Sequence, residues 1–405
     1  MSILRLRDVR LIVGAVGLSS AGDALLWVLL ALHVGETGGS ALAVSALFIC
    51  LWGPVVVLGG VAGRIVDRHE NRRLLIAVSL AQAAVVAAMA FSADSLAALL
   101  MLSALLGAGV AVGSPAEFAL VPAAAGEERV AEANGQVEAA RYLGLTVGPL
   151  VGGALAAAGS TRLGLLLDAA SFLAVAAAAV ALHARRDPDA AEHAEGATRA
   201  REGIAFLHAD RTLAIALAAA IGSLLFFTIS VSAEVFFATD VLDAGATGYG
   251  VLISSWTLGM VAGAVGLARL VAGHRLAVGA LAGVAVQGLG LFGAAVGATL
   301  VVALVAFLVG GLAHGAKNVL FRTLIHEHVP ERLRGRAFAA YNAARNGAEL
   351  GALAAGGVLV ALLGARTALA LSGAIPLAIA IGALMLMARR EAAAPAGAAY
   401  VPAQG

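Results

Sequence analysis

One apolar segment of the chain reads Gly144-Leu145-Thr146-Val147-Gly148-Pro149-Leu150-Val151-Gly152-Gly153, with four glycines and a proline. In a water-soluble helix each glycine costs about 1 kcal/mol relative to alanine, and a proline costs about 3 kcal/mol. In a bilayer, small residues let helix backbones approach closely, and neighbouring groups satisfy the carbonyls that a proline frees. Gly144, Gly148 and Gly152 recur at every fourth position, so we expect one smooth helix face, bent at Pro149. Such a face suits two helix bundles that pack tightly and still rock against each other.

The composition indicates a membrane protein. Of the 405 residues, 61% are hydrophobic and 13% are charged, and the mean hydropathy is +0.95. A soluble domain is closer to half apolar and a quarter charged. Cys50 is the only cysteine, which excludes an internal disulfide. The first apolar segment is long and no small-residue cleavage pattern follows it, so we interpret it as a retained span and not as a signal peptide.

A helical span needs about 20 apolar residues, and the chain has enough for about a dozen. We therefore predict an all-α membrane protein with twelve transmembrane helices in two pseudo-symmetric six-helix bundles. The predicted spans are 10–34, 41–63, 74–91, 96–117, 134–158, 162–183, 211–238, 247–268, 275–294, 298–321, 337–362 and 366–388.

The spans divide the chain into four parts. Residues 1–183 form the first half and residues 211–390 the second. Residues 184–210 are expected to form a cytoplasmic linker, with a short amphipathic helix from Arg201 to Asp210. Residues 391–405, rich in alanine, proline and glycine, are expected to be a disordered cytoplasmic tail.

The arginines predict the orientation. Most of them lie in the loops on one side of the predicted bundle, whereas the opposite loops hold only Arg162 and Arg366. Cytoplasmic loops carry the excess of Lys and Arg, so both termini are expected in the cytoplasm. The alanine-, glycine- and arginine-rich composition suggests a bacterium, and hence its cytoplasmic membrane.

The two halves share a weak internal repeat. Three matches occur at the same offset of 208 residues, which is close to half the chain, as two fused six-helix halves require. The matches are Val121-Pro122 with Val329-Pro330, Asn134 with Asn342, and Gly148 with Gly356.

The predicted loop between the second and third spans is rich in charge. It includes Gly63, Asp67, Arg68, Arg72 and Arg73. Glycine permits close packing where the helix ends. The aspartate is able to accept hydrogen bonds from arginines or from a helix start, and so to latch one conformation. The alternative for the arginines is anchoring on the cytoplasmic side.

Both motifs resemble signatures of the major facilitator superfamily. The loop residues Gly63, Asp67, Arg68, Arg72 and Arg73 are similar to the motif between its second and third spans. The run of Gly144, Gly148, Pro149, Gly152 and Gly153 is similar to the fifth-span motif of its drug:proton antiporters. The stretches Ser20-Ala21-Gly22-Asp23, Ser114-Pro115-Ala116 and Asp168-Ala169-Ala170-Ser171-Phe172 resemble the branch of enterobactin-type siderophore exporters and macrolide efflux proteins. The resemblance implies an exporter driven by protons.

Ionisable groups at membrane depth are expensive, which makes each one a functional candidate. Asp23 lies near the middle of the first span, flanked by apolar residues. Burial disfavours the charged form of a carboxyl, so Asp23 is a candidate for binding and releasing a proton or for contacting substrate. The alternative is a structural carboxyl bonded to a neighbouring helix.

Two polar stripes lie on helices related by the repeat. Asn134, Glu138 and Arg141 share one face of the fifth span, and Asn342, Arg345, Asn346 and Glu349 share one face of the eleventh. Glu349 is our second candidate for the proton carrier. Alternatively, Glu138–Arg141 and Arg345–Glu349 are ion pairs that stabilise one state.

Several further polar residues lie in predicted spans. Asp168 and Glu234 are candidates for a cavity or an outer gate. His314 is a candidate for titration near neutral pH, although a lone histidine in a span is more often a hydrogen-bonded structural group. Lys317 and Glu117 are expected to reach toward the membrane surface. We expect the aromatic residues to pack against neighbouring helices rather than to line a cavity; they are Trp27, Trp52, Tyr142 and Trp256.

No phosphate-binding loop, metal cluster or nucleic-acid motif is present in the sequence, so we expect no cofactor, no metal and no catalysis. We predict a monomeric secondary transporter that exports a small organic molecule such as a drug, macrolide or siderophore in exchange for protons. An uptake symporter and a non-transporting sensor on the same scaffold are the alternatives. The sequence leaves the cargo open.

Overall fold

The computed structural model describes residues 3–38, 40–186, 207 and 210–393 of the 405. Most of the predicted linker 184–210, including nearly all of its predicted amphipathic helix, and nearly all of the predicted tail 391–405 lie outside the described residues. The part of the chain that is described forms twelve long helices and several short turns. Within these residues the expected all-α fold is confirmed.

The helices of the first half are α1 (Arg7–Gly38), α2 (Ala41–Arg68), α3 (Asn71–Phe91), α4 (Leu96–Ala125), α5 (Val130–Ala157) and α6 (Thr161–Ala181). Those of the second half are α8 (Arg211–Phe236), α9 (Gly245–Val265), α10 (Leu276–Gly297), α11 (Leu300–His328), α12 (Glu331–Leu363) and α13 (Ala365–Ala393). Several run past the predicted spans, because the hydropathy pattern marks only the apolar part of a helix. The loop predicted between the second and third spans is thus reduced to His69 and Glu70.

Eleven of these helices are long and apolar enough to cross a membrane. The exception among the described helices is α5, whose length is sufficient but whose apolar pattern is interrupted by Glu138, Arg141 and the glycine–proline run. One of these positions, Arg141, enters a cavity between helices of the first half, where a polar residue does not meet lipid.

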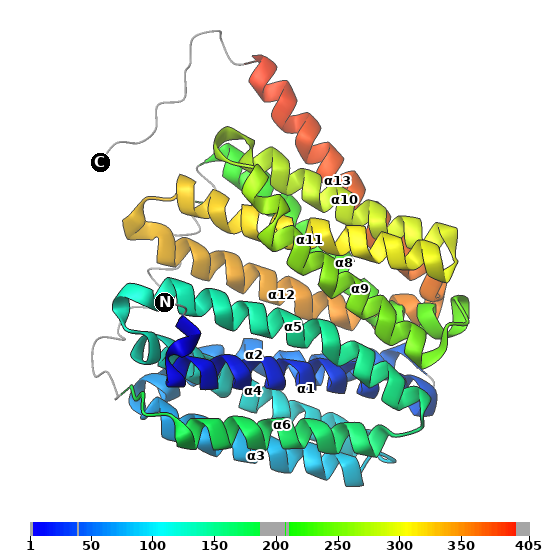
Figure 1. The fold of residues 1–405 in the computed structure, drawn as a ribbon. Coiled ribbons are helices and arrows are strands. Elements are labelled where there is room, and N and C mark those ends of the chain that lie inside the picture. The colour runs from blue at the N-terminus through cyan, green and yellow to red at the C-terminus, as the bar shows by residue number, and fades with distance from the viewer. Residues whose placement is uncertain (1–2, 39, 187–206, 208–209, 394–405) are drawn as a thin grey trace.

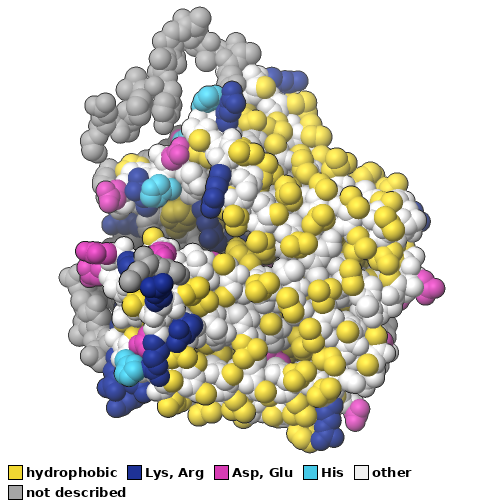
Figure 2. Space-filling view, viewed as in Figure 1, with side chains coloured by type: hydrophobic (Ala, Val, Ile, Leu, Met, Phe, Trp, Pro, Cys, Tyr) yellow, Lys and Arg dark blue, Asp and Glu magenta, His cyan; other side chains and the backbone are white. Residues whose placement is uncertain are grey.

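Charge and apolar surface are segregated along the molecule. Figure 2 shows Lys and Arg side chains gathered at the end where the N-terminus lies in Figure 1, while apolar side chains cover the flank. We call this end, where α1 begins, the basic end, and the opposite end, where α2 begins, the far end. Strongly exposed side chains on the flank, such as Val57, Val301 and Leu362, are apolar, as contact with lipid requires.

The two halves pack their helices in corresponding ways (Figure 1). In the first half α1 packs against α5 and α6, α2 against α4, and α3 against α6. In the second half α8 packs against α12 and α13, α9 against α11, and α10 against α13. The predicted pair of pseudo-symmetric bundles is therefore confirmed.

The halves join at the far end. One continuous core of buried apolar residues there includes side chains from both halves, among them Leu29, Leu47, Phe237 and Leu353. At the basic end each half has a separate core, around Val9 and Leu120 in the first and around Leu281 and Phe321 in the second. The halves are thus packed together at one end of the bundle and have no common apolar core at the other.

Direct contacts at the far end follow two helix pairs, α2 with α12 and α5 with α9. The hydroxyls of Ser45 on α2 and Ser232 on α8 are buried and lie 2.7 Å apart. A Cβ added at Gly357 on α12 would lie 2.6 Å from the Ser45 hydroxyl. Between α5 and α9, a Cβ at Gly153 would lie 3.0 Å from the Cα of Gly250.

The glycine stripe of α5 is confirmed, but its partner differs from the expected one. Added side chains at Gly144, Gly148 and Gly152 would strike the backbone of α1, a helix of the same half. Only Gly153, on another face of α5, touches the second half. The stripe therefore fastens α5 to α1 within a half, and the surface between halves uses a separate glycine. The spacing of four puts three glycines on one face but does not identify the helix opposite.

We predict that Gly148→Leu destabilises the first half, because its side chain would meet the carbonyl oxygen of Ala21. Overpacking of this kind costs about 1–3 kcal/mol. Thermal unfolding of the detergent-solubilised protein, followed by tryptophan fluorescence, measures the loss. Gly59→Leu is the matched control, since nothing lies within 4 Å of a Cβ at Gly59; equal effects from the two variants would contradict the assigned contact.

Candidate functional site

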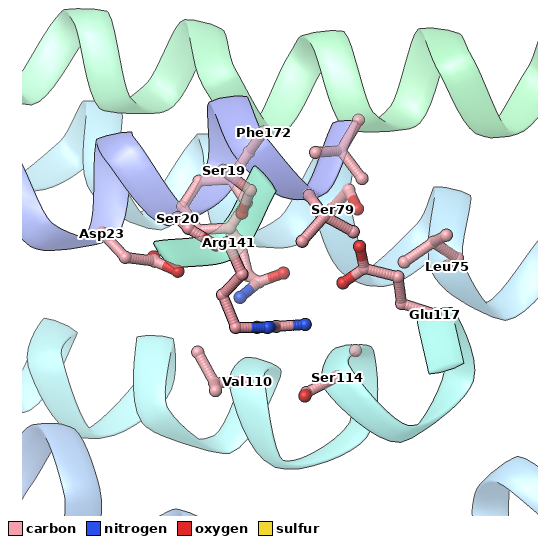
Figure 3. A pocket seen from close by; sticks show the side chains of 14 residues that line it. Ser19, Ser20, Asp23, Leu75, Ser79, Val110, Ser114, Glu117, Arg141 and Phe172 are labelled. Carbon is pink, nitrogen blue, oxygen red and sulfur yellow. The ribbon is translucent and has the colours of Figure 1, made fainter. Parts of the chain in front are cut away.

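A polar cavity lies inside the first half, enclosed by α1, α3, α4, α5 and α6. Its volume is ≈ 80 Å³, which is enough for several water molecules. Three ionisable side chains line it, together with hydroxyl and amide groups (Figure 3). The polar lining comprises Ser19, Ser20, Asp23, Ser79, Gln82, Ser114, Glu117 and Arg141.

Asp23, Glu117 and Arg141 reach the cavity from three helices. Figure 3 shows the guanidinium of Arg141, from α5, extending between Asp23 on α1 and Glu117 on α4. The positive charge of Arg141 acts on both carboxyl groups. Arg141 also lies 3.5 Å from the carboxylate of Glu138, measured from its Nε, and its guanidinium sits 4.8 Å from the ring centroid of Phe118.

The hydrogen bonds of this cluster are incomplete. Among the described residues, Nε and Nη2 of Arg141 and Oε1 of Glu117 are buried without a hydrogen-bond partner. Buried polar atoms are usually satisfied by protein groups or by ordered water, and the cavity beside these atoms has room for water. One guanidinium thus has three carboxyl groups within its reach, and no short hydrogen bond holds it to any of them.

Small residues on the surrounding helices create this cavity. A Cβ at Gly144 would lie 2.7 Å from the backbone nitrogen of Ala21, so the glycine lets α5 approach α1 closely. Arg141, one turn before Gly144, is thereby brought near Asp23. On α4, a Cβ at Gly109 would lie 2.8 Å from Cγ of Gln82, so this glycine makes room for the amide.

Asp168 lies beside this cavity but does not line it. Its side chain is completely buried, with the Ser171 hydroxyl donating to Oδ1 at 3.1 Å. Gly22 on α1 leaves the space that the carboxyl fills. The expectation that Asp168 lines a cavity is therefore wrong for this conformation, because the carboxyl is turned into the α1–α6 contact, where Gly22 leaves room for it. A role of Asp168 at an outer gate stays a prediction.

The polar residues of the second half make local pairs. Nη2 of Arg345 lies 2.6 Å from Oε1 of Glu349, so the pairing expected on α12 is confirmed. Glu234 accepts a hydrogen bond of 2.7 Å from the Ser230 hydroxyl. These residues lie on α8 and α12 and do not join the cavity of the first half.

The charged motif that was predicted as a loop is divided between the end of α2 and the start of α3. Gly63, Asp67 and Arg68 lie within α2, which continues to Arg68. Nothing lies within 4 Å of a Cβ at Gly63, so the close packing expected there is absent in this conformation, because the helix runs on past the glycine. A latch at Asp67 stays a prediction.

Arg72 binds the end of another helix. Its Nε and Nη2 donate to the carbonyl oxygens of Ala179 and Val180, at 3.0 and 2.9 Å. These carbonyls belong to the last turn of α6, where intrahelical donors run out; that of Ala179 also accepts a long hydrogen bond of 3.3 Å from the backbone N–H of Leu182. Arg7 donates to the next carbonyl, that of Ala181, at 2.8 Å. Arg73, by contrast, is 86% exposed and lies 3.3 Å from Glu70.

Sequence reasoning identified part of the cavity. Asp23, Glu138 and Arg141 were expected, but Glu117 was interpreted as a surface-seeking side chain and Gln82 and the serines were not considered. Glu117 is a carboxyl in an apolar span, and that signal alone could have identified it. Gln82 and the serines give no such signal, because each is common in a membrane helix. Of the aromatic residues, Trp27 packs edge-on against Trp52, and Trp256 stacks on Phe227.

The described chain forms twelve long helices in two corresponding halves, and most of these helices are apolar enough to span a bilayer. Ionisable groups are buried between them. Together these features define a polytopic membrane transporter. The chain belongs to the Major Facilitator Superfamily, whose family pattern matches residues 12–352. The superfamily assignment made from the two motifs is thereby confirmed.

Several known proteins are similar over almost the whole chain. The Bacillus subtilis protein described as "Uncharacterized MFS-type transporter YfiS" is 26% identical over 396 residues, which are 93% of this chain and 91% of that protein. A crystal structure of a POT family transporter in complex with 5-aminolevulinic acid has a TM-score of 0.76 at 10% identity, covering 95% of this chain and 96% of that one. A bacterial homolog of the human lysosomal transporter Spinster, described as inward-facing and unoccupied, has a TM-score of 0.64 at 15% identity, covering 96% and 99%. The structural likenesses establish the fold.

We predict different effects for the two adjacent arginines. Arg72→Gln removes charge-assisted hydrogen bonds from the end of α6 and should lower the free energy of unfolding by about 2 kcal/mol. Arg73→Gln removes only an exposed pair and should change it by less than about 0.5 kcal/mol. Thermal unfolding of the two purified variants, side by side, checks this. If the Arg73 variant were as unstable as the Arg72 variant, the stabilising role assigned to the hydrogen bonds between Arg72 and the end of α6 would be contradicted.

Proposed function

We propose that this transporter exports a small organic molecule, such as a drug, macrolide or siderophore, from the cytoplasm in exchange for protons. It works by alternating access, in which a central space between the halves opens first to one side of the membrane and then to the other. The observation that carries the proposal is the cavity in which Asp23 and Glu117 lie beside Arg141.

Charge balance suits this cavity to proton handling. If both carboxyls that line the cavity were ionised, Asp23 and Glu117 beside one guanidinium would leave one negative charge uncompensated, which is unfavourable at a buried site. A proton on one carboxyl relieves this excess, and Arg141 then balances the charge of the other. Asp23 is our first candidate for the carrier, because its carboxyl lines the cavity near the middle of α1, within electrostatic reach of Arg141; Glu349 on α12 is the second.

The arrangement of the cores supports alternating access. The halves share one core at the far end and have separate cores at the basic end. With the basic end in the cytoplasm, as the arginines predict, this is an inward-facing conformation. Export requires that such a state receive cargo from the cytoplasm and that the far-end contacts then open.

Inward proton movement is a sufficient driving force. Each charge that moves inward across 100 mV releases about 2.3 kcal/mol, before any pH gradient is added. The glycine–proline run on α5 favours exchange over uptake, through its resemblance to antiporter motifs. A proton-coupled symporter and a non-transporting sensor are the other outcomes of the tests below.

The central test uses proteoliposomes with an imposed pH gradient and an internal pH-sensitive dye. We expect addition of a labelled macrolide or an aromatic organic anion to drive proton movement opposite to the cargo in the wild type, and Asp23→Asn to abolish it while cargo-for-cargo exchange continues. Asp94→Asn, the same change at an exposed turn, is the control.

The direction of proton flux separates the alternatives. Proton and cargo movement in the same direction would identify a symporter, and the absence of flux with every cargo would favour a sensor. Coupled transport by Asp23→Asn at the wild-type rate would remove Asp23 as the carrier.

A second prediction concerns the far-end contact. Because the Ser45 and Ser232 hydroxyls lie 2.7 Å apart, cysteines at both positions should form a disulfide across the halves. In a Cys50→Ser background, oxidised Ser45→Cys/Ser232→Cys protein should lose transport, and a reductant should restore it. Each single cysteine variant serves as control. Full transport by the oxidised, cross-linked protein would contradict opening at the far end.

A further inference from the structure

The second half contains a basic cluster that differs from the cavity of the first half, where the carboxyls of Asp23 and Glu117 lie beside one arginine. His314 and Lys317 lie on α11, and Arg345 on α12 is close enough to act electrostatically on both. The acid of this second cluster, Glu349, is already paired with Arg345 at 2.6 Å. Within the cluster two cationic side chains, Lys317 and Arg345, therefore share one acid.

Lys317 is the unusual member of the cluster. It is the only lysine among the 26 Lys and Arg residues of the chain, and it is 9% exposed. Its ammonium donates to the amide oxygen of Asn318 at 3.2 Å, and within the described residues no carboxylate lies within 4.0 Å of it. The fold makes room for it, because a Cβ at Gly283 on α10 would lie 2.8 Å from the Cβ of Lys317.

Two aromatic rings pack against His314, which is close to this lysine on α11. His314 lies three residues before Lys317, on the same face of α11. Its ring is 5.2 Å from that of Phe227 on α8 and 5.5 Å from that of Trp256 on α9, and those two rings are stacked at 5.4 Å. Nδ1 of His314 lies 3.2 Å from the amide oxygen of Gln287, which orients the imidazole. All three rings are partly exposed rather than sealed in the core.

A buried ammonium without a carboxylate partner is unfavourable, and a bound anion would relieve that cost. An aromatic ring on the same ligand would pack against the rings beside it. We propose that the cargo is an organic anion with a flat aromatic ring, whose carboxylate or phenolate binds Lys317 and Arg345 and whose ring contacts Phe227 and Trp256. Among the cargo classes named above, this favours anionic siderophore-like molecules over cationic macrolides.

The identification as cargo rests on the proposed export function, but binding is measurable without transport. The probes are naphthoate and naphthylmethylammonium, which share a ring system and carry opposite charges. Equilibrium dialysis against the detergent-solubilised full chain at neutral pH gives both affinities. We expect naphthoate to bind the wild type more tightly than the ammonium probe does.

Substitutions then locate the site. Lys317→Gln should weaken naphthoate binding about tenfold or more, as loss of a charged hydrogen bond predicts, and leave the ammonium probe unaffected. Lys317→Arg, which keeps the charge, should restore much of the affinity. Arg162→Gln, at the far end, is the matched control and should leave binding unchanged. If Lys317→Gln does not elute as a folded monodisperse species, Arg345→Gln provides the same comparison.

Two results would contradict the proposed anion site. One is equal or tighter binding of the ammonium probe by the wild type. The other is unchanged naphthoate affinity in a folded Lys317→Gln protein. Charge-selective binding that depends on Lys317 supports it even where vesicles show no proton exchange. In that case the proton-driven export proposal fails, and the anion site stands.

Discussion

The absence of side chains on one face of α5 is the constraint on which the first half depends. Gly144, Gly148 and Gly152 each face the backbone of α1 at a distance that a Cβ would not tolerate. Because the helices lie this close, Arg141 enters the same cavity as Asp23 and Glu117. The close packing and the buried charges are thus linked, since a wider gap between the helices would separate the guanidinium from the carboxyl on α1.

The second half repeats the packing with different chemistry. Gly356, the repeat partner of Gly148, faces Ile229 on α8, the counterpart of α1. The neighbouring Gly357 instead meets α2 of the first half, and Gly153 on α5 meets α9. The related helices α5 and α12 therefore both have glycine contacts within their own half and one glycine contact to the other half. Around this shared frame two carboxyls and one arginine line the cavity of the first half, whereas Lys317 and Arg345 of the second half share one acid, Glu349.

Figure 1 and the distribution of the cores show where the halves are held together. A common apolar core and the Ser45–Ser232 pair join them at the far end, and two separate cores remain at the basic end. The alternating access that we propose requires the halves to rock and exchange this arrangement. Because the Gly148 and Gly356 contacts lie within halves, they are able to persist during such a movement, while the contacts of Gly153 and Gly357 must open.

The sequence by itself determined the class of fold, because the number and length of apolar segments reflect the thickness of a bilayer. Its motifs identified the superfamily, and its repeat indicated two related halves. It also identified Asp23, Arg141 and the Arg345–Glu349 pair, since charges in apolar spans stand out. Only the tertiary structure decided which helix the glycines face, that Asp168 is turned against Gly22, that Arg72 binds the end of α6, and that Glu117 and Gln82 share a cavity with Arg141. The physical reason is that helical periodicity specifies the face on which a residue lies, whereas the neighbour across that face depends on the packing of helices distant in sequence.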